Sequence, residues 1–136
     1  MKSIPDNIIS PPKDYFIVKD GVQYAGTHLL VDLWNAKKLD DISYIDKTIR
    51  ECIISCEATL LHIHLHHFTS SGGISGVAVL AESHISVHTW PERNYAAFDI
   101  FMCGDAKPEN ALPVLKRAFS PERFEVKEML RGKAEK

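Results

Sequence analysis

The feature that most constrains this chain is a polar segment enclosed between two apolar ones. Residues 81–92, AESHISVHTWPE, carry carboxylates, hydroxyls, two imidazoles and an indole. The flanking residues 76–80 and 95–103 are mostly apolar, which is typical of buried strands. A polar segment held between two pieces of scaffold predicts a functional site, or the exposed face of a strand.

Length and charge exclude several classes of protein. A chain of 136 residues is expected to form one domain. The net charge of −2 offers no basic surface for phosphates, so we expect no nucleic-acid partner. No apolar run is long enough to span a membrane, and residues 1–6 lack the apolar centre of a signal peptide. We therefore expect a cytoplasmic protein with no membrane contact.

The three cysteines are expected to be free thiols, because their odd number does not suit a disulfide framework in a reducing compartment. Cys52 and Cys56 lie four residues apart on one predicted helical stripe. Core packing is therefore a better interpretation of this pair than metal binding.

The ends of the chain differ from its middle. Residues 1–20 contain three prolines near their start and no periodicity over most of their length, which predicts an extended N-terminal arm. Short runs on either side of Asp20-Gly21 predict a small hairpin where the arm meets the domain. We place the domain at residues 21–130 and a charged tail at 131–136.

Periodicity within the domain predicts a two-layer α+β sandwich. Asp41 and Asn110 are expected to cap two helices that end near Cys56 and Phe119. Besides the central segment, strands are expected at 28–34, 61–66, 74–80, 95–103 and 124–129. Short links between the middle strands indicate a mainly antiparallel sheet with both helices on one face. The other face then needs a cover, for which a partner subunit is the simplest candidate.

Glu82 and Ser83 permit an unusual reaction. A Ser–His hydrolase is a poor interpretation, because no Gly-x-Ser-x-Gly elbow surrounds Ser83. Instead, the Ser83 hydroxyl can attack the preceding carbonyl carbon and convert the amide into an ester. Loss of the Ser83 Cα proton would then expel the Glu82 carboxylate, and the resulting dehydroalanine hydrolyses to a pyruvoyl group. The sequence offers His88 and Ser75 as candidates for assisting this route.

A different class of function is suggested by His62, His64 and His66. Alternation along one strand places the three imidazoles on one face, where they could ligate a metal. A polar strand face at a subunit interface explains the same pattern, and no carboxylate or thiolate with local spacing completes the site. A non-enzymatic metal-binding module therefore stays as an alternative.

The central segment and its flanks resemble a known signature. Residues 73–92, GISGVAVLAESHISVHTWPE, and 95–104, YAAFDIFMCG, are similar to the signature of prokaryotic S-adenosylmethionine decarboxylase proenzymes. The resemblance runs from about Gly26 to Phe119. The segment between Phe68 and Ser75 is one residue longer here than in those proteins.

The resemblance implies self-cleavage between residues 82 and 83, giving chains 1–82 and 83–136. Ser83 would become the pyruvoyl cofactor, and Glu82 would end the first chain. His88 would be the base for processing, Ser75 would assist it, and Cys103 would be the proton donor in decarboxylation. No metal is expected in this site.

The resemblance also implies the substrate contacts and the assembly. Glu92 would hold the ribose hydroxyls of S-adenosylmethionine, and Phe68 would stack on the adenine. Ile85 and Trp90 would line the pocket. Two processed protomers would pair into a four-layer αββα homodimer that shares its active sites.

The function expected on this basis is pyruvoyl-dependent decarboxylation of S-adenosylmethionine. The pyruvoyl group would form a Schiff base with the substrate and accept the electrons released with CO₂. The product would be the aminopropyl donor for spermidine synthesis. Because this chemistry suits any α-amino acid, an arginine or ornithine decarboxylase on the same fold stays as an alternative.

Overall fold

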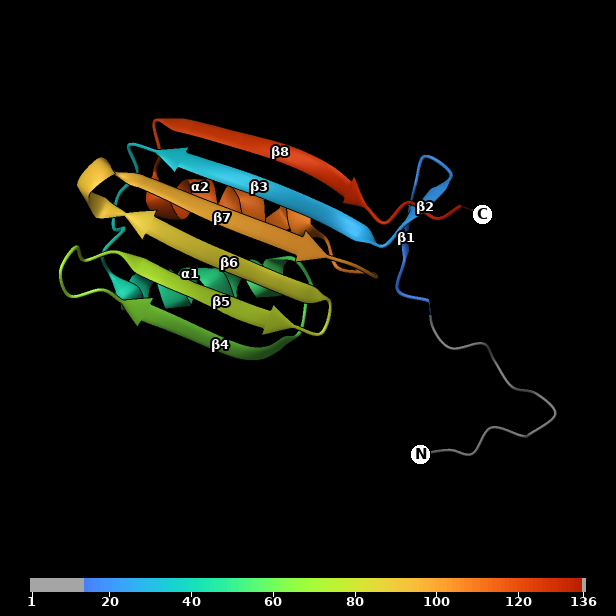
Figure 1. The fold of residues 1–136 in the computed structure, drawn as a ribbon, viewed down its shortest axis with the longest axis horizontal. Coiled ribbons are helices and arrows are strands. Elements are labelled where there is room, and N and C mark those ends of the chain that lie inside the picture. Colours follow the sequence, from blue (N-terminus) through green and yellow to red (C-terminus); the bar gives the residue numbers. More distant parts are fainter. Residues whose placement is uncertain (1–13, 136) are drawn as a thin grey trace.

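The computed structural model describes residues 14–135, which form one six-stranded sheet with two helices on one face (Figure 1). The sheet order is β4-β5-β6-β7-β3-β8, and every neighbouring pair is antiparallel. The strands are β3 (Gly26–Trp34), β4 (Leu60–His67), β5 (Ile74–Leu80), β6 (Ser83–Trp90), β7 (Tyr95–Met102) and β8 (Arg123–Arg131). The expected two-layer α+β architecture is confirmed.

The two helices begin in different ways. In α1 (Ile42–Ser55) the predicted cap is confirmed, because the Asp41 carboxylate accepts the Tyr44 backbone N–H at 3.0 Å. Asn110 occupies the N-cap position of α2 (Ala111–Phe119) without a side-chain capping bond. Its amide nitrogen instead donates to the Ser55 carbonyl at 3.0 Å, which ties the start of α2 to the end of α1. The predicted capping role of Asn110 is therefore corrected.

Two 3-10 turns and a hairpin complete the described chain. The turns are η1 (Pro91–Arg93) and η2 (Pro108–Asn110). The hairpin joins β1 (Ile17–Lys19) to β2 (Val22–Tyr24) through Asp20 and Gly21, both at positive φ as an Asp-Gly turn requires. Residues 17–19, which lie in the expected N-terminal arm, form the first strand of this hairpin. The expected arm over residues 1–13 and the tail residue Lys136 lie outside the described residues.

The two faces of the sheet differ because side chains alternate along each strand. On β6, Ile85 and Val87 are buried against the helices, and Ile85 is only 1% exposed. The intervening residues His84, Ser86 and His88 project to the opposite side, which we call the open face. No element of residues 14–135 covers that face (Figure 1). No helix in this part of the chain is long and apolar enough to cross a membrane.

Replacing Ile85 with alanine should test its place in the core. Ile85→Ala is expected to lower the free energy of unfolding by about 2–5 kcal/mol, because it removes buried methyl groups and leaves a cavity. Urea denaturation measures the change. Ile54→Ala is the matched control, since Ile54 is 76% exposed. Equal effects of the two substitutions would contradict the placement.

Candidate active site

The residues predicted to form one site lie at the two ends of β6. Ser83 begins this strand, and His88 and Trp90 lie near its end. Five residue steps at about 3.3 Å each place His88 about 16 Å from Ser83 along the strand. Within one chain, the structure therefore brings together two separate groups of predicted residues.

The first group surrounds the Glu82–Ser83 peptide bond. The Cys103 backbone N–H donates to the Glu82 carbonyl oxygen at 2.9 Å. Thr59 holds the Glu82 carboxylate with its backbone N–H at 2.9 Å and its hydroxyl at 3.2 Å. The carbonyl that Ser83 would attack is thus fixed in direction, and it is polarised by a hydrogen-bond donor.

Ser83 itself has a conformation that L-amino acids avoid. Its φ is +136°, although it is the first residue of a strand. A residue in such a region costs about 1–3 kcal/mol and persists only where its surroundings impose it. The strain lies directly at the predicted cleavage point.

Cys103 lies beside this bond with a partly exposed side chain. It follows the last residue of β7, and the backbone N–H of Gly104 donates to the Tyr15 carbonyl at 2.6 Å. Cys52 and Cys56 are buried, as the helical stripe predicted, and both are free thiols. Burial raises the pKa of Cys56 to about 12, and it raises the pKa of Cys52 further.

The second group lies at the other end of β6. Ser75 and His88 face each other across β5 and β6, and the Ser75 hydroxyl lies 2.9 Å from His88 Nδ1. Trp90 is 40% exposed, and its ring lies 5.2 Å from that of Tyr95. Glu92 follows in η1 and is exposed. These side chains can bind a ligand above the open face.

The two remaining predicted pocket residues lie in different environments. Phe68 follows β4, is 44% exposed and pairs its N–H with the Gly73 carbonyl at 2.8 Å. The longer segment is accommodated in the loop that this bond closes. Ile85 is buried against the helices, so its side chain does not line a pocket on the open face. That expected role is corrected, because odd-numbered β6 residues face the core.

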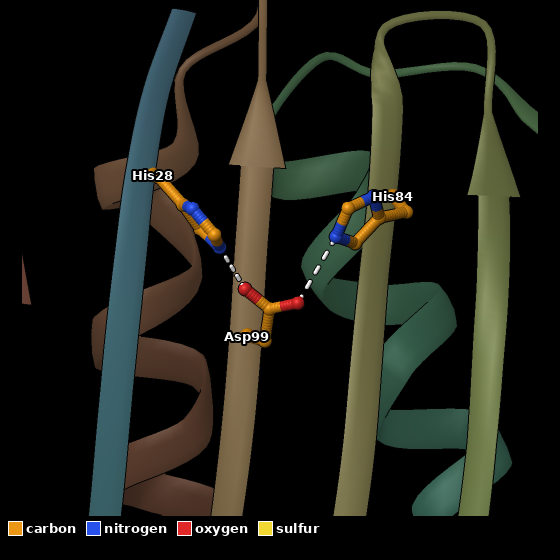
Figure 2. A group of neighbouring side chains, drawn as sticks. All are labelled: His28, His84 and Asp99. Atoms are coloured by element: carbon orange, nitrogen blue, oxygen red, sulfur yellow. Dashed lines mark hydrogen bonds and ion pairs between the residues drawn. The ribbon is translucent and has the colours of Figure 1, made fainter. Parts of the chain in front are cut away.

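A polar cluster around Asp99 occupies the open face, and it includes His84, the residue that follows Ser83 on β6 (Figure 2). One Asp99 oxygen contacts His28 Nε2 of β3, and the other lies 3.0 Å from His84 Nε2 of β6. The Ser86 hydroxyl donates to the second oxygen at 3.2 Å. Burial raises the pKa of Asp99, but hydrogen bonds from His28 and His84 lower it by more. The net pKa lies below its ordinary value, and the carboxylate is ionised at neutral pH.

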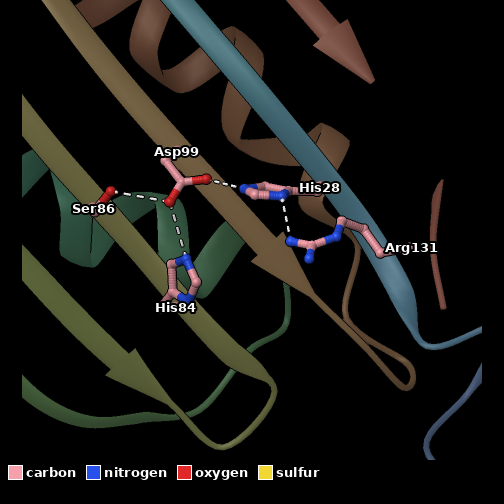
Figure 3. A network of polar contacts seen from close by, with 5 residues as sticks. All are labelled: His28, His84, Ser86, Asp99 and Arg131. Carbon is pink, nitrogen blue, oxygen red and sulfur yellow. Dashed lines mark hydrogen bonds and ion pairs between the residues drawn. The ribbon is translucent and has the colours of Figure 1, made fainter. Parts of the chain in front are cut away.

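Arg131 approaches this cluster at His28. Its guanidinium lies 3.3 Å from His28 Nδ1 and can only donate (Figure 3). His28 Nδ1 must then accept, so the proton resides on Nε2 and points at Asp99. Arg131 therefore donates to His28, and His28 donates to the Asp99 carboxylate. His84 contacts the other oxygen of the same carboxylate.

The metal alternative finds no support in this geometry. Of the described residues, only His28, His84 and Asp99 bring three possible ligand atoms within 4.8 Å of one another. A metal on His28 Nε2 would displace the proton that Arg131 places there, next to a fixed positive charge. His62, His64 and His66 are exposed along the edge strand β4 and form no such group.

Sequence patterns alone do not predict the place of several residues in this region. Asp99 interrupts the apolar run 95–103, and that lone charge was a signal that a partner exists. His28 and Arg131 become its neighbours only through the pairing of β3 with β7 and β8. Thr59 carried no signal, because the loop that brings it to Glu82 depends on the left-handed conformation of Glu57 (φ +58°).

Comparison with known proteins identifies close relatives. A family model described as S-adenosylmethionine decarboxylase matches residues 27–132. An S-adenosylmethionine decarboxylase proenzyme of Methanococcus aeolicus is 45% identical over 114 residues, covering 82% of this chain and 97% of the relative. One from Thermomicrobium roseum is 42% identical over 108 residues, covering 79% and 93%.

A solved structure agrees with these matches. The crystal structure of the adenosylmethionine decarboxylase from Aquifex aeolicus is 31% identical and superimposes with a TM-score of 0.76. The match covers 83% of this chain and 95% of that protein. The fold described above is therefore the fold of that enzyme.

The cysteines should differ sharply in reactivity. Iodoacetamide at pH 8 is expected to modify Cys103 first, because its side chain is accessible. Cys52 and Cys56 should react only on unfolding, because burial blocks access and their raised pKa values keep them as thiols. Peptide mass mapping over time measures the order, and early modification of Cys56 would contradict it.

Proposed function

The chain belongs to the S-adenosylmethionine decarboxylase family, and on that premise we propose a self-cleaving proenzyme whose product decarboxylates S-adenosylmethionine. The observation that carries the proposal is the geometry of the Glu82–Ser83 bond. Its carbonyl is held by the Cys103 N–H at 2.9 Å, and Ser83 is strained at φ +136°. A strained peptide with an oxyanion donor is what an acyl shift requires.

Self-cleavage would proceed in two steps. The Ser83 hydroxyl attacks the Glu82 carbonyl carbon, the C–N bond breaks, and the freed amine takes the hydroxyl proton, leaving an ester. The Cys103 N–H stabilises the oxyanion during this attack. A base then removes the Ser83 Cα proton. The bond between Ser83 Cβ and the ester oxygen breaks, which releases the Glu82 carboxylate. The remaining dehydroalanine takes up water and loses ammonia, which leaves the pyruvoyl group.

The base for these steps would come from a second copy of the chain. His88 and Ser75 lie about 16 Å from the Ser83 of their own chain, beyond the reach of an imidazole. Two open faces packed together in opposite directions would bring one chain's His88 to the other's Ser83. Exposed apolar side chains on the open face support this packing, among them Leu30, Val77, Val79 and Met129. We therefore propose a homodimer with two shared sites.

The residues around these sites have distinct roles in decarboxylation. The pyruvoyl group, once formed, supplies the electron sink for CO₂ loss. Cys103 would return a proton to the substrate carbon from its accessible thiol. Glu92 would accept hydrogen bonds from the two ribose hydroxyls, and Phe68 and Trp90 offer exposed rings for the adenine.

The product of this reaction is an aminopropyl donor for spermidine synthesis. We place the reaction in the cytoplasm, where three free thiols are stable.

Subunit complementation tests both the cleavage and the dimer. Ser83→Ala alone should stay intact, because it lacks the attacking hydroxyl, and His88→Ala alone should stay intact for want of the base. When the two variants are co-expressed, the His88→Ala chain should be cleaved, because its Ser83 meets the His88 of the other variant. Mass spectrometry distinguishes chains 1–82 and 83–136 of each tagged partner.

The control is a preparation in which the mixed dimer has been isolated through two different tags. An intact His88→Ala chain in that mixed dimer would contradict the shared site. Cleavage of Ser83→Ala alone would contradict the mechanism itself.

Substitution of Glu92 tests the choice of substrate. Glu92→Gln should reduce kcat/KM for S-adenosylmethionine by about ten- to a hundredfold, because hydrogen bonds to a charged group contribute about 1.5–3 kcal/mol. Self-cleavage should persist, since no ribose is present during processing. The assay compares S-adenosylmethionine, arginine and ornithine at equal pyruvoyl content. A wild-type preference for arginine or ornithine would favour the alternative enzyme.

A further inference from the structure

We propose that Thr59 and Asp99 are positioning residues for self-cleavage, which hold the two neighbours of Ser83 and so keep Ser83 in its strained conformation. This inference rests on the proposed self-processing and adds to it. It assigns a role to one residue before β4 and one in the middle of β7, neither of which touches the reacting atoms.

The upstream anchor acts on Glu82. Thr59 provides two donors to the two oxygens of the Glu82 carboxylate, at 2.9 and 3.2 Å. The Thr59 carbonyl also accepts the Ala81 N–H at 3.0 Å, so the turn before β6 is held at two successive residues. With the Cys103 N–H on the Glu82 carbonyl, both the side chain and the backbone of Glu82 are fixed.

The downstream anchor acts on His84. Its ring is held by Asp99, which is itself held by His28 from the neighbouring strand β3 (Figure 3). Arg131 fixes the proton of His28 toward Asp99, and Ser86 adds a further donor. His28 and Ser86 thus keep Asp99 in one orientation, with Arg131 acting through His28, and Asp99 keeps the His84 ring on the open face.

The strain at Ser83 follows from these two anchors. Glu82 and His84 are each tied to a different part of the scaffold, so Ser83 must take whatever φ joins them, which is +136°. If either neighbour could rotate, Ser83 would relax to an ordinary β conformation and its hydroxyl would lose its fixed relation to the Glu82 carbonyl. Positive-φ conformations of this kind persist only where neighbours impose them.

The test is the rate of self-cleavage of freshly synthesised full-length chain. Thr59→Val removes one donor without a change of size, and Asp99→Asn removes the charge that holds His84. Each should slow cleavage about tenfold, equivalent to about 1.4 kcal/mol in the barrier. Hydroxylamine cleaves esters and not amides, so it traps the product of the acyl shift. The hydroxylamine-dependent rate should fall equally, which a defect in the later elimination would not produce.

Matched variants separate positioning from general stability. Thr48→Val removes a hydroxyl that bonds only within α1, and Asp46→Asn removes an acid paired with Arg50 on the helix surface. Both should cleave at the wild-type rate. Thr59→Ser keeps the hydroxyl and should also cleave normally. Melting temperatures should show that Thr59→Val, at an exposed position, folds as well as the wild type.

Two outcomes would overturn the inference. Wild-type cleavage rates in both Thr59→Val and Asp99→Asn would show that the anchors are not needed. The proposed cleavage would still stand in that case if Ser83→Ala stays intact. A normal hydroxylamine-dependent rate in slow variants would place their effect after the acyl shift. If Asp99→Asn fails to fold, Thr59→Val with its serine control decides the question.

Discussion

The antiparallel register of β5, β6 and β7 determines where Ser75, Ser83, His88 and Cys103 lie relative to one another. It pairs Ser75 with His88 at one end of β6 and Ser83 with Met102 at the other. Because Cys103 follows Met102, the same register delivers its N–H to the Glu82 carbonyl. A shift of one residue between β6 and β7 would move the Cys103 N–H away from the Glu82 carbonyl and place the facing side chains of the two strands on opposite faces of the sheet.

The register also separates the proposed site residues into two groups within one chain. A strand is rigid and extended, so groups five residues apart on β6 cannot converge on one atom. The open face meanwhile carries both polar groups and exposed apolar side chains, which suits a face that meets another protein surface. A two-fold pairing of open faces would bring the two groups of residues together, because it places the two ends of β6 opposite each other. It would also cover the exposed apolar side chains.

Much of this arrangement could be predicted from the sequence, and the failures have physical causes. Alternation along the strands predicted the strands and their faces, and the Asp20-Gly21 turn predicted the hairpin. The same alternation places the Ile85 side chain in the core, on the opposite side of β6 from His84, Ser86 and His88. The sequence pattern therefore already argued against a place for that side chain in a pocket on the open face. The Asp99 cluster could not be predicted, because β3 and β7 pair across more than sixty residues of sequence. Thr59 reaches Glu82 only through the conformation of a loop.

The strain at Ser83 would also favour the product of the proposed self-cleavage. In the intact chain, Ser83 is joined to Glu82 by a peptide bond and its positive φ costs about 1–3 kcal/mol. That cost is small beside a typical domain stability of about 5–15 kcal/mol, so the precursor can fold with it. Breaking of this peptide bond and conversion of Ser83 to a pyruvoyl group would leave residue 83 with no φ and no tetrahedral Cα, so the strain would disappear. The anchors on Glu82 and His84 would then hold two chain ends in place with nothing strained between them, and the proposed reaction would relieve the folded scaffold of the energetic cost at Ser83.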